Sequence, residues 1–441
     1  MSLTELREAI QLKQAHLAVI GLGYVGLPVA CQFAVAGFDV LGVDVLSGRV
    51  DQINEGISPI AGNEPGLSEL LESVITSGQF RATDDYLALR DRDVILIAVE
   101  TPIDENNQPL YTALRSVLND LGPVMKSGSL VIIESTIAPG TTRDLVLPLL
   151  TESSGKISNR DFYLGVCPER VMPGKLLTNL KNVSRVVGGM TPEIASTMVS
   201  LYSHIVQAGL DPTDCITAEL VKTVENAYRD VQIAFANEVA LICETVGGDV
   251  WDVRSLVNKS PYRQMHLPGA GVGGHCIPKD PWLLAFGVKN QDVPLRLIPA
   301  ARLVNDSMPH HMINILDDAL SEAGCQIPGS RILVMGCAYL EDSDDTRNSP
   351  SAILVTRLHE MDAQVIIHDP YVSRYQGDLM KMAHECDAAV VMVRHTGYRE
   401  FDLVKLNRVM RTPVLIDGRS IFTPSQLEAA GFTYRILGKA A

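Results

Sequence analysis

A glycine-rich segment with a single cysteine, residues 268–281, holds the residue types best suited to covalent chemistry in this chain. Four glycines within six residues, 269–274, let the backbone approach a ligand closely because no Cβ stands in the way. Cys276 follows, and a helix-like run begins at Trp282. A thiol at such a turn is well placed to act as a nucleophile. A buried cysteine without a chemical role is the alternative, but the glycines, His275 and Asp280 favour a functional thiol.

A second glycine motif near the N-terminus predicts a dinucleotide site. The strand-like run 17–20 leads directly into Gly21-Leu22-Gly23-Tyr24-Val25-Gly26, and a helical run follows. In such a strand–turn–helix unit the first glycine makes the turn, the second leaves room for a pyrophosphate, and the third lets helix pack on strand. The pyrophosphate would lie at the helix N-terminus.

The next predicted strand, 38–43, ends at Asp44, which is 18 residues after Gly26. This is about the spacing expected for the acid that binds the ribose hydroxyls of a dinucleotide. A carboxylate there favours NAD and repels the 2′-phosphate of NADP. Arg49 is a candidate for the adenosine end, although an exposed helical arginine would have the same pattern.

Two more predicted strands, 94–99 and 130–133, each end beside a threonine, Thr101 and Thr136. In open α/β sheets, ligands lie beyond the carboxyl ends of the strands. Both hydroxyls are therefore placed to hydrogen-bond a cofactor or a water, although a helix cap or a turn uses the same residue type. A further strand, 163–166, leads into Cys167-Pro168-Glu169-Arg170-Val171-Met172-Pro173-Gly174.

The segment 218–246 contains neither glycine nor proline and predicts one long helix. Lys222, Asn226 and Arg229 lie at i, i+4 and i+7 and so share one face. Their neighbours are largely apolar, and a polar stripe in apolar surroundings is costly unless it meets a ligand or partners. A solvated face is the alternative. The apolar surface of this helix also predicts a homodimer or a higher homo-oligomer.

Composition excludes several classes of protein. Hydrophobic residues make up 46% of the 441 residues and charged residues 20%, which is typical of a globular protein. No apolar run is long enough to span a membrane, and the polar N-terminus does not look like a secretion signal. A net charge of −15 argues against nucleic acid as a partner. Eight scattered cysteines without a CxxC pair predict free thiols in a reducing cytoplasm and no zinc site.

The chain is long enough for two or three domains. Strand-like runs at 331–335, 364–367, 388–393 and 414–416 alternate with helical stretches and predict a second parallel sheet without the glycine fingerprint. We therefore expect an α/β fold with two Rossmann-like parallel-sheet domains joined by a long central helix and a helical middle domain. The expected ranges are 1–210 for the NAD-binding domain, 211–320 for the central helices and the cysteine loop, and 321–441 for the second sheet domain.

Taken together, these segments resemble the UDP-glucose/GDP-mannose dehydrogenase family, the nucleotide-sugar 6-dehydrogenases, over nearly the whole chain. The motifs that carry the resemblance are GLGYVGLP, EPGLSELL, VETP, ESTIAPGTT, CPERVMPG, ELVKTVENAYRDVQIAFANE, GVGGHCIPKDP, ARLVND, and GCAYL followed by DDTRNSP. CPERVMPG and the YRDVQIAFANE helix are most similar to the branch that acts on UDP-N-acetylhexosamines. The resemblance implies UDP-N-acetyl-D-mannosamine as substrate, with UDP-N-acetylglucosamine and UDP-glucose as alternatives.

The resemblance also implies a four-electron oxidation in which the C6 alcohol becomes a carboxylate and two NAD⁺ are consumed. Cys276 would attack the C6 aldehyde, and water would hydrolyse the resulting thioester. Lys222 corresponds to the proton donor and acceptor and Asn226 to its partner. The positions that handle the hydrolytic water correspond to Asp280, Thr136 and Glu169.

Two sets of ligand contacts follow from the same resemblance. For the cofactor they are, besides the glycines, Tyr24, Val25, Asp44, Thr101, Thr136 and Arg347, the last from the second sheet domain or a neighbouring subunit. For the nucleotide sugar they are Arg170, Val171, Lys222, Asn226, Arg229, Arg263, Gly273, Arg302, Tyr339 and Arg419.

One position departs from the family pattern, because Leu340 stands where the family usually has a lysine that reaches into the sugar site. Two other functions are alternatives to the four-electron oxidation. An ordinary two-electron hydroxyacid or sugar dehydrogenase would explain Lys222 and Asn226 but not Cys276. A non-catalytic sensor of NAD or nucleotide sugars would explain Leu340.

Overall fold

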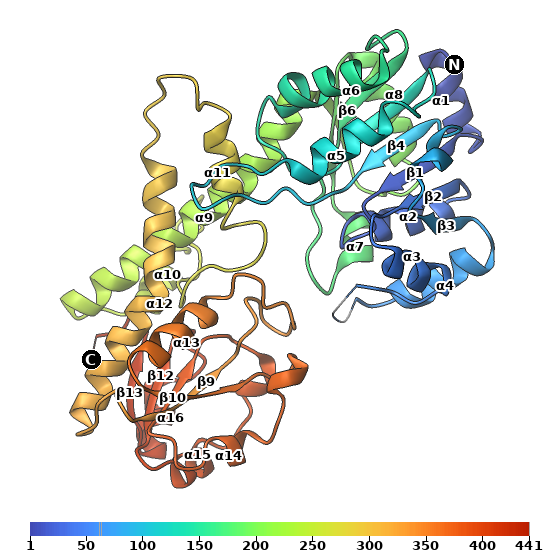
Figure 1. Ribbon diagram of the computed structural model, residues 1–441. Helices are drawn as coiled ribbons and strands as arrows, with labels where there is room; N and C mark the ends of the chain where they lie inside the picture. The colour runs from blue at the N-terminus through green and yellow to red at the C-terminus, as the bar shows by residue number, and fades with distance from the viewer. Residues whose placement is uncertain (61, 63, 441) are drawn as a thin grey trace. The chain divides into compact units, whose positions relative to one another are not determined.

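The computed structural model describes residues 1–60, 62 and 64–440, and these form two compact units (Figure 1). The first unit holds Met1–Glu225 and Trp282–Val293. The second holds Asn226–Pro281 and the chain from Pro294 onward. Each unit contains its own β-sheet and its own buried core, which is the expected consequence of a chain this long.

The sheet of the first unit has eight strands in the order β3-β2-β1-β4-β5-β6-β7-β8. Its strands are β1 (His16–Ile20), β2 (Asp39–Val43), β3 (Phe80–Thr83), β4 (Val94–Ile97), β5 (Ser129–Ile133), β6 (Phe162–Val166), β7 (Arg185–Gly189) and β8 (Leu210–Asp214). Neighbouring strands are parallel except β6 and β7, which are antiparallel. The predicted Rossmann-like sheet is thus confirmed, and the antiparallel pair is an addition that the sequence did not predict.

Helices cover both faces of this sheet (Figure 1). Successive strand residues point to opposite faces, so Leu17 and Val19 of β1 join one core while Ala18 and Ile20 join the other. The helices of this unit are α1 (Leu3–Gln11), α2 (Gly26–Val35), α3 (Ser47–Asn54), α4 (Leu67–Thr76), η1 (Tyr86–Leu89), α5 (Thr112–Leu121), η2 (Thr142–Val146), α6 (Leu147–Ser154), α7 (Leu176–Asn182) and α8 (Pro192–Tyr202). Core residues of α1, α2 and α8 lie on the first face, and those of α5 and α6 on the second.

The predicted long helix is confirmed as α9 (Cys215–Val246), which begins three residues before the predicted start. It is followed by α10 (Val250–Val257), α11 (Asp280–Phe286) and α12 (Leu297–Glu322). Pro309 lies inside α12 and is buried there. Because α9 is unbroken, Lys222, Asn226 and Arg229 keep the one-face spacing expected from the sequence.

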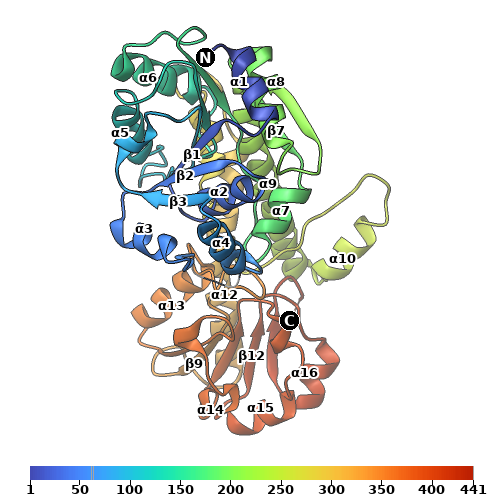
Figure 2. The same cartoon turned by 90° about the vertical axis from the view of Figure 1, so that its right-hand side faces the viewer.

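The sheet of the second unit has five parallel strands in the order β10-β9-β11-β12-β13. Its strands are β9 (Arg331–Met335), β10 (Gln364–His368), β11 (Ala388–Val391), β12 (Val414–Asp417) and β13 (Thr433–Ile436). Figure 2 shows the surrounding helices α13 (Pro350–Glu360), α14 (Leu379–Met382), α15 (Leu403–Val409) and α16 (Pro424–Ala430). The same unit also contains the short helices η3 (Ser373–Tyr375) and η4 (Thr396–Tyr398). This confirms the second parallel sheet.

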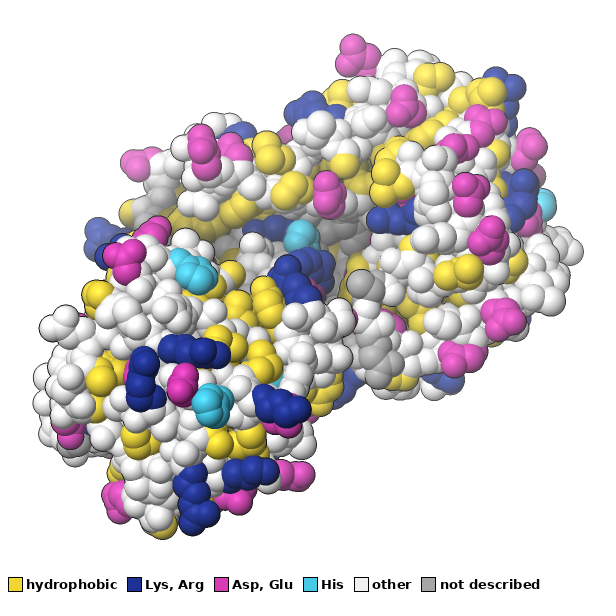
Figure 3. All heavy atoms as spheres, turned by 60° about the horizontal axis from the view of Figure 1, so that its bottom comes forward, with side chains coloured by type: hydrophobic (Ala, Val, Ile, Leu, Met, Phe, Trp, Pro, Cys, Tyr) yellow, Lys and Arg dark blue, Asp and Glu magenta, His cyan; other side chains and the backbone are white. Residues whose placement is uncertain are grey.

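Among the described residues, no helix combines the length and the apolar character that crossing a bilayer requires. On the face shown in Figure 3, acidic and basic side chains are interspersed with apolar and uncharged ones.

Candidate active site

The turn after β1 has the geometry that a dinucleotide requires. Gly21 has φ +90°, and a Cβ there would lie 2.5 Å from the carbonyl oxygen of Ala98. A Cβ on Gly26 would lie 1.9 Å from the carbonyl oxygen of Gly21, so helix α2 can pack against the turn only with glycine at this position. In contrast, no described heavy atom lies within 4 Å of the Cβ position of Gly23. The open side at Gly23 therefore fits a pyrophosphate.

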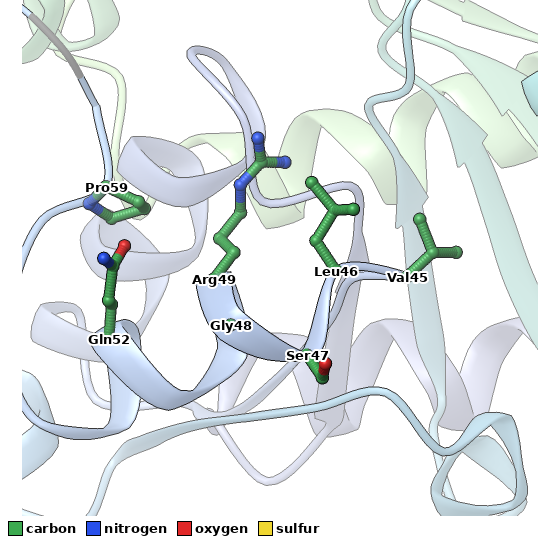
Figure 4. Close-up of a pocket in the computed structure, with 7 residues that line it drawn as sticks. All are labelled: Val45, Leu46, Ser47, Gly48, Arg49, Gln52 and Pro59. Carbon is green, nitrogen blue, oxygen red and sulfur yellow. The ribbon is translucent and has the colours of Figure 1, made fainter.

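Asp44 lies at the end of β2 and is only 5% exposed. Its carboxylate accepts hydrogen bonds from the N–H groups of Leu22 (2.9 Å) and Leu46 (3.0 Å) and pairs with the Arg49 guanidinium at 2.9 Å. A pocket of about 490 Å³ adjoins it, and Figure 4 shows Arg49 and Leu46 projecting from the start of α3 beside this pocket. The residues that line it are Val45, Leu46, Ser47, Gly48, Arg49, Gln52 and Pro59. The arrangement suits the adenosine half of NAD.

The other predicted cofactor residues of this unit flank the turn or the next strand ends. Val25 is the N-cap residue of α2, and the Tyr24 hydroxyl bonds to the Glu64 carboxylate. Thr101 donates its hydroxyl to the carbonyl oxygen of Thr136 at 2.6 Å. This bond holds two strand ends together, and the cofactor roles of both threonines stay predictions.

Glu169 belongs to a buried ionic cluster that the sequence did not reveal. Its carboxylate lies 2.7 Å from the guanidinium of Arg185, which is 1% exposed. Arg185 also lies 3.4 Å from Glu134, and the hydroxyl of Tyr202 donates to Glu134 at 2.7 Å. Burial raises the pKa of Glu134 to about 7, although Arg185 opposes the shift. Glu169 is therefore fixed in orientation, and its role towards water stays a prediction.

Arg170, predicted to meet the sugar nucleotide, is engaged within the same unit. Its guanidinium forms two bonds to Glu225, at 2.5 and 3.1 Å, and donates to the carbonyl oxygen of Ser184 at 2.7 Å. Val171, the next residue, packs against the core of the sheet. A substrate anion would have to compete with Glu225 for this guanidinium.

The cysteine loop is held by the loop that follows β9. The N–H of Gly274 donates to the carbonyl oxygen of Arg347 at 2.9 Å, and the Asn348 amide donates to the carbonyl oxygen of Gly274 at 3.1 Å. A Cβ on Gly273 or Gly274 would come within 2.7 Å of the Tyr339 side chain. These two glycines are thus required by close packing, and the packing fixes the backbone just before Cys276.

Cys276 differs from every other cysteine in the chain. It is the one exposed thiol among the eight, all of which lie in the described part of the structure. Burial raises the pKa of the thiols of Cys31, Cys167 and Cys215 to about 12, which makes them poor nucleophiles. Accessibility therefore singles out the cysteine that the sequence favoured.

Asp280, at the start of α11, is fully buried and holds two partners. One carboxylate oxygen accepts from the Asn226 amide at 2.5 Å, and the other lies 2.5 Å from the ammonium of Lys279. Its N–H and that of Lys279 both donate to the carbonyl oxygen of Cys276. The structure thus brings together Asn226, Asp280 and the Cys276 backbone. Lys279 was missed, although its place between Cys276 and Asp280 in the motif was a clue.

The predicted sugar-binding arginines of the second unit fall into two groups. Arg302 is 2% exposed and is neutralised by Asp230 at 2.6 Å and by Asp306. Arg419 donates to the carbonyl oxygen of Met392 at 2.8 Å. In contrast, Arg229 and Arg263 are exposed. Arg229 and Arg263 can reach a substrate without displacing a protein partner that buries them. The substrate contacts of all four arginines stay predictions.

Two sets of predicted residues are thus each gathered within one unit. The first unit holds the dinucleotide turn, Asp44, Thr136, Glu169 and Lys222. The second unit holds Asn226, Asp280, Cys276, Tyr339 and Arg347, the last paired with Asp345. The first set has the features of a dinucleotide site, and the second contains the exposed thiol of Cys276.

Comparison with known proteins gives three consecutive family matches. Residues 15–206 match the NAD binding domain of the UDP-glucose/GDP-mannose dehydrogenase family, residues 216–307 its central domain and residues 333–424 its UDP binding domain. The chain is 38% identical over 424 residues to a UDP-N-acetyl-D-mannosamine dehydrogenase of Pyrococcus horikoshii, covering 96% of this chain and 99% of that protein.

Solved structures agree with this result. A UDP-D-ManNAc dehydrogenase from Pyrococcus horikoshii superimposes with a TM-score of 0.90 at 37% identity, over 96% of this chain and 99% of that one. An NDP-N-acetyl-D-galactosaminuronic acid dehydrogenase from Methanosarcina mazei Go1 gives a TM-score of 0.86 at 36% identity, over 100% and 98%. Both similarities extend over both units.

Proposed function

Because the chain belongs to the UDP-glucose/GDP-mannose dehydrogenase family, we propose that it is an NAD-dependent enzyme that oxidises the C6 alcohol of a UDP-N-acetylhexosamine to the carboxylate. UDP-N-acetyl-D-mannosamine is the proposed substrate, since relatives with that name are similar over their full length. The domain ranges proposed for this activity are 1–210, 211–320 and 321–441. The observation that carries the proposal is the exposed Cys276 on a glycine loop within a chain of this family.

The proposed chemistry proceeds in three stages. The C6 alcohol loses a hydride and a proton to give the aldehyde. The Cys276 thiolate then adds to the aldehyde carbon, and this thiohemiacetal loses a second hydride to give a thioester. Water hydrolyses the thioester, which releases the carboxylate and returns the thiol. NAD⁺, when bound at the dinucleotide turn, supplies the hydride acceptor for both oxidations.

The residues around the chemistry have separate proposed roles. Lys222 moves the proton of the C6 hydroxyl and steadies the developing oxyanion. Asp280, held between Lys279 and Asn226, orients the groups that activate the hydrolytic water. Thr136 and Glu169 are proposed to act on the same water. The thioester stage matters because a thiolate keeps the aldehyde in the site until the second hydride is lost.

Product stoichiometry tests the proposal directly. UDP-N-acetyl-D-mannosamine, UDP-N-acetylglucosamine, UDP-N-acetylgalactosamine and UDP-glucose are each incubated with NAD⁺, and NADH and uronate are counted. The expected result is two NADH per uronate, with the highest kcat/KM for the mannosamine sugar. Cys276→Ala is expected to make no uronate, while Cys325→Ala, a matched half-buried cysteine, stays active. One NADH per product molecule would contradict the cysteine stage, and binding without NADH would favour a sensor.

We also propose that α9 forms a homodimer interface and that the protein works in the cytoplasm. Tyr228, Phe235, Ile242 and Val246 are 62%, 62%, 52% and 73% exposed, and their spacing of seven, seven and four places them along one side of the helix. Apolar side chains exposed in a row are typical of a protein contact. Eight scattered cysteines without a CxxC pair suit a reducing compartment.

A further inference from the structure

We propose that Glu219 is a positioning residue that ties the start of α9 to the segment 136–142 and thereby sets the place of Lys222 relative to Thr136. The inference rests on the proposed function, because it takes the roles of Lys222 and Thr136 from it. All the residues concerned belong to the first unit.

The Glu219 side chain is 2% exposed, and its carboxylate is bonded to main-chain N–H groups, with the charge of Arg143 making the weakest of the favourable contributions. One oxygen accepts the N–H of Gly140 at 2.6 Å, and the other accepts the N–H of Thr142 at 2.8 Å. Burial raises the pKa of Glu219, and the hydrogen bonds from the segment oppose the shift. Burying a carboxylate costs free energy unless its oxygens accept hydrogen bonds. Here each oxygen accepts one backbone N–H of the irregular segment, so the two donors are paired as well.

The segment 136–142 is held from two other sides by groups of its own domain. Thr101 donates to the carbonyl oxygen of Thr136 at 2.6 Å, and the Tyr111 hydroxyl accepts the N–H of Ala138 at 2.9 Å. Gly140 has φ +91°, a conformation that suits glycine, and it donates its N–H to Glu219 of α9. Glu219 therefore joins this segment to α9 by two hydrogen bonds, in addition to the apolar core that both share.

Lys222 follows Glu219 by three residues on the same helix, so the two side chains project within one turn of each other. Any slide or rotation of α9 against the segment moves the Lys222 ammonium with it. A displacement of about 1 Å at a reacting group can cost about 100-fold in rate. The two hydrogen bonds of Glu219, three residues before Lys222, thus limit such a displacement.

The test uses Glu219→Gln in the full chain with NAD⁺ and the UDP-sugar. Glutamine keeps the shape, but its amide sets a donor against one of the two N–H groups. We expect kcat to fall about 10- to 100-fold while the KM for NAD⁺ changes less than about twofold. Glu152→Gln, an exposed glutamate of α6, is the matched control and is expected to match the unmutated protein. If the glutamine variant does not fold, kcat and the KM for NAD⁺ are measured on Glu219→Asp, which retains the charge but has a shorter side chain.

A double-mutant cycle distinguishes a role of Glu219 that acts through Lys222 from a merely structural role. If Glu219 acts through Lys222, then Glu219→Gln in a Lys222→Ala background lowers the single-turnover rate less than about twofold. If the two losses multiply, the proposal is wrong. Amide exchange over residues 136–142 needs no substrate and separates this inference from the proposed function. Exchange is expected to rise at least about tenfold in Glu219→Gln and to stay unchanged in Lys222→Ala, and unchanged exchange in Glu219→Gln would overturn the inference.

Discussion

Replacing Asp44 by asparagine is expected to weaken NAD⁺ binding and to admit NADP⁺. The carboxylate is oriented by the two backbone N–H groups of Leu22 and Leu46 and by Arg49, so it meets the ribose as a fixed charged acceptor. A hydrogen bond to a charged group contributes about 1.5 to 3 kcal/mol. Losing that contribution raises the KM for NAD⁺ about 10- to 150-fold.

The gain for NADP⁺ comes from charge. A 2′-phosphate about 4 Å from the Asp44 carboxylate would be repelled by about 4 kcal/mol per unit charge at an effective dielectric constant of 20. The substitution removes this repulsion and releases Arg49, which is 34% exposed, to pair with the phosphate. Because NAD⁺ binding is weakened at the same time, the ratio of kcat/KM for NAD⁺ to that for NADP⁺ is expected to fall by about 1000-fold or more.

Steady-state rates with both cofactors at saturating UDP-sugar measure this ratio. Asp51→Asn, an exposed residue of the same helix as Arg49, is the control and is expected to leave the ratio unchanged. Adding Arg49→Ala to Asp44→Asn is expected to reduce the gain for NADP⁺ without abolishing it, because the repulsion by the carboxylate stays removed. A ratio that stays within about threefold in Asp44→Asn would refute the assignment of Asp44 as the discriminating acid.

Three further predictions follow from the second unit. Gly274→Ala is expected to lower kcat at least about 100-fold, because this residue has φ +90° and the new Cβ would lie 2.7 Å from the Tyr339 ring; near-normal turnover would show that the loop tolerates the shift. Asp280→Asn, which breaks the contact with Lys279, is expected to slow thioester hydrolysis more than the first hydride transfer, so a burst of NADH precedes slow turnover in stopped flow; its absence would contradict the assigned stage. Phe235→Glu is expected to dissociate the proposed dimer, and an unchanged sedimentation coefficient would count against α9 as the interface.

The sequence was informative wherever the chemistry is local. The dinucleotide turn, the strand before it and the acid after it are read within one βαβ stretch, and the structure places Gly21, Gly26 and Asp44 as that pattern predicts. The long helix could also be predicted, since the sequence between 218 and 246 contains neither glycine nor proline. In these places propensity and tertiary packing favour the same conformation.

The partners of buried charges could not be predicted from the sequence. Arg185 lies 51 residues from Glu134, and only the pairing of strands brings the two together. The same applies to Glu219, whose carboxylate accepts the N–H groups of Gly140 and Thr142, 79 and 77 residues earlier in the chain. Arg302 was expected to contact the nucleotide sugar, but its charge is neutralised by Asp230, a pairing that the sequence did not reveal. Burial and pairing depend on contacts far along the chain, which spacing does not reveal.

The buried cluster around Arg185 predicts how stability changes with pH. Burial raises the pKa of Glu134 from the ordinary 4.5 to about 7, despite the attraction of Arg185. The folded state therefore binds one more proton than the unfolded state between those values. This stabilisation is complete below about pH 4.5 and is lost as the pH rises through about 7.

Glu134→Gln removes the titrating group and keeps an acceptor for the Tyr202 hydroxyl. Between pH 5 and 8 the free energy of unfolding of the unmutated protein is expected to fall by about 2 to 3 kcal/mol relative to that of the glutamine variant. Urea unfolding at four pH values measures the difference, and Glu193→Gln, an exposed control, is expected to give no such slope. Titrating groups remote from the cluster of Glu134, Glu169 and Arg185 are common to both proteins, and their contributions cancel in the difference. Parallel curves would mean that Glu134 is ionised throughout, with Arg185 fully compensating for its burial.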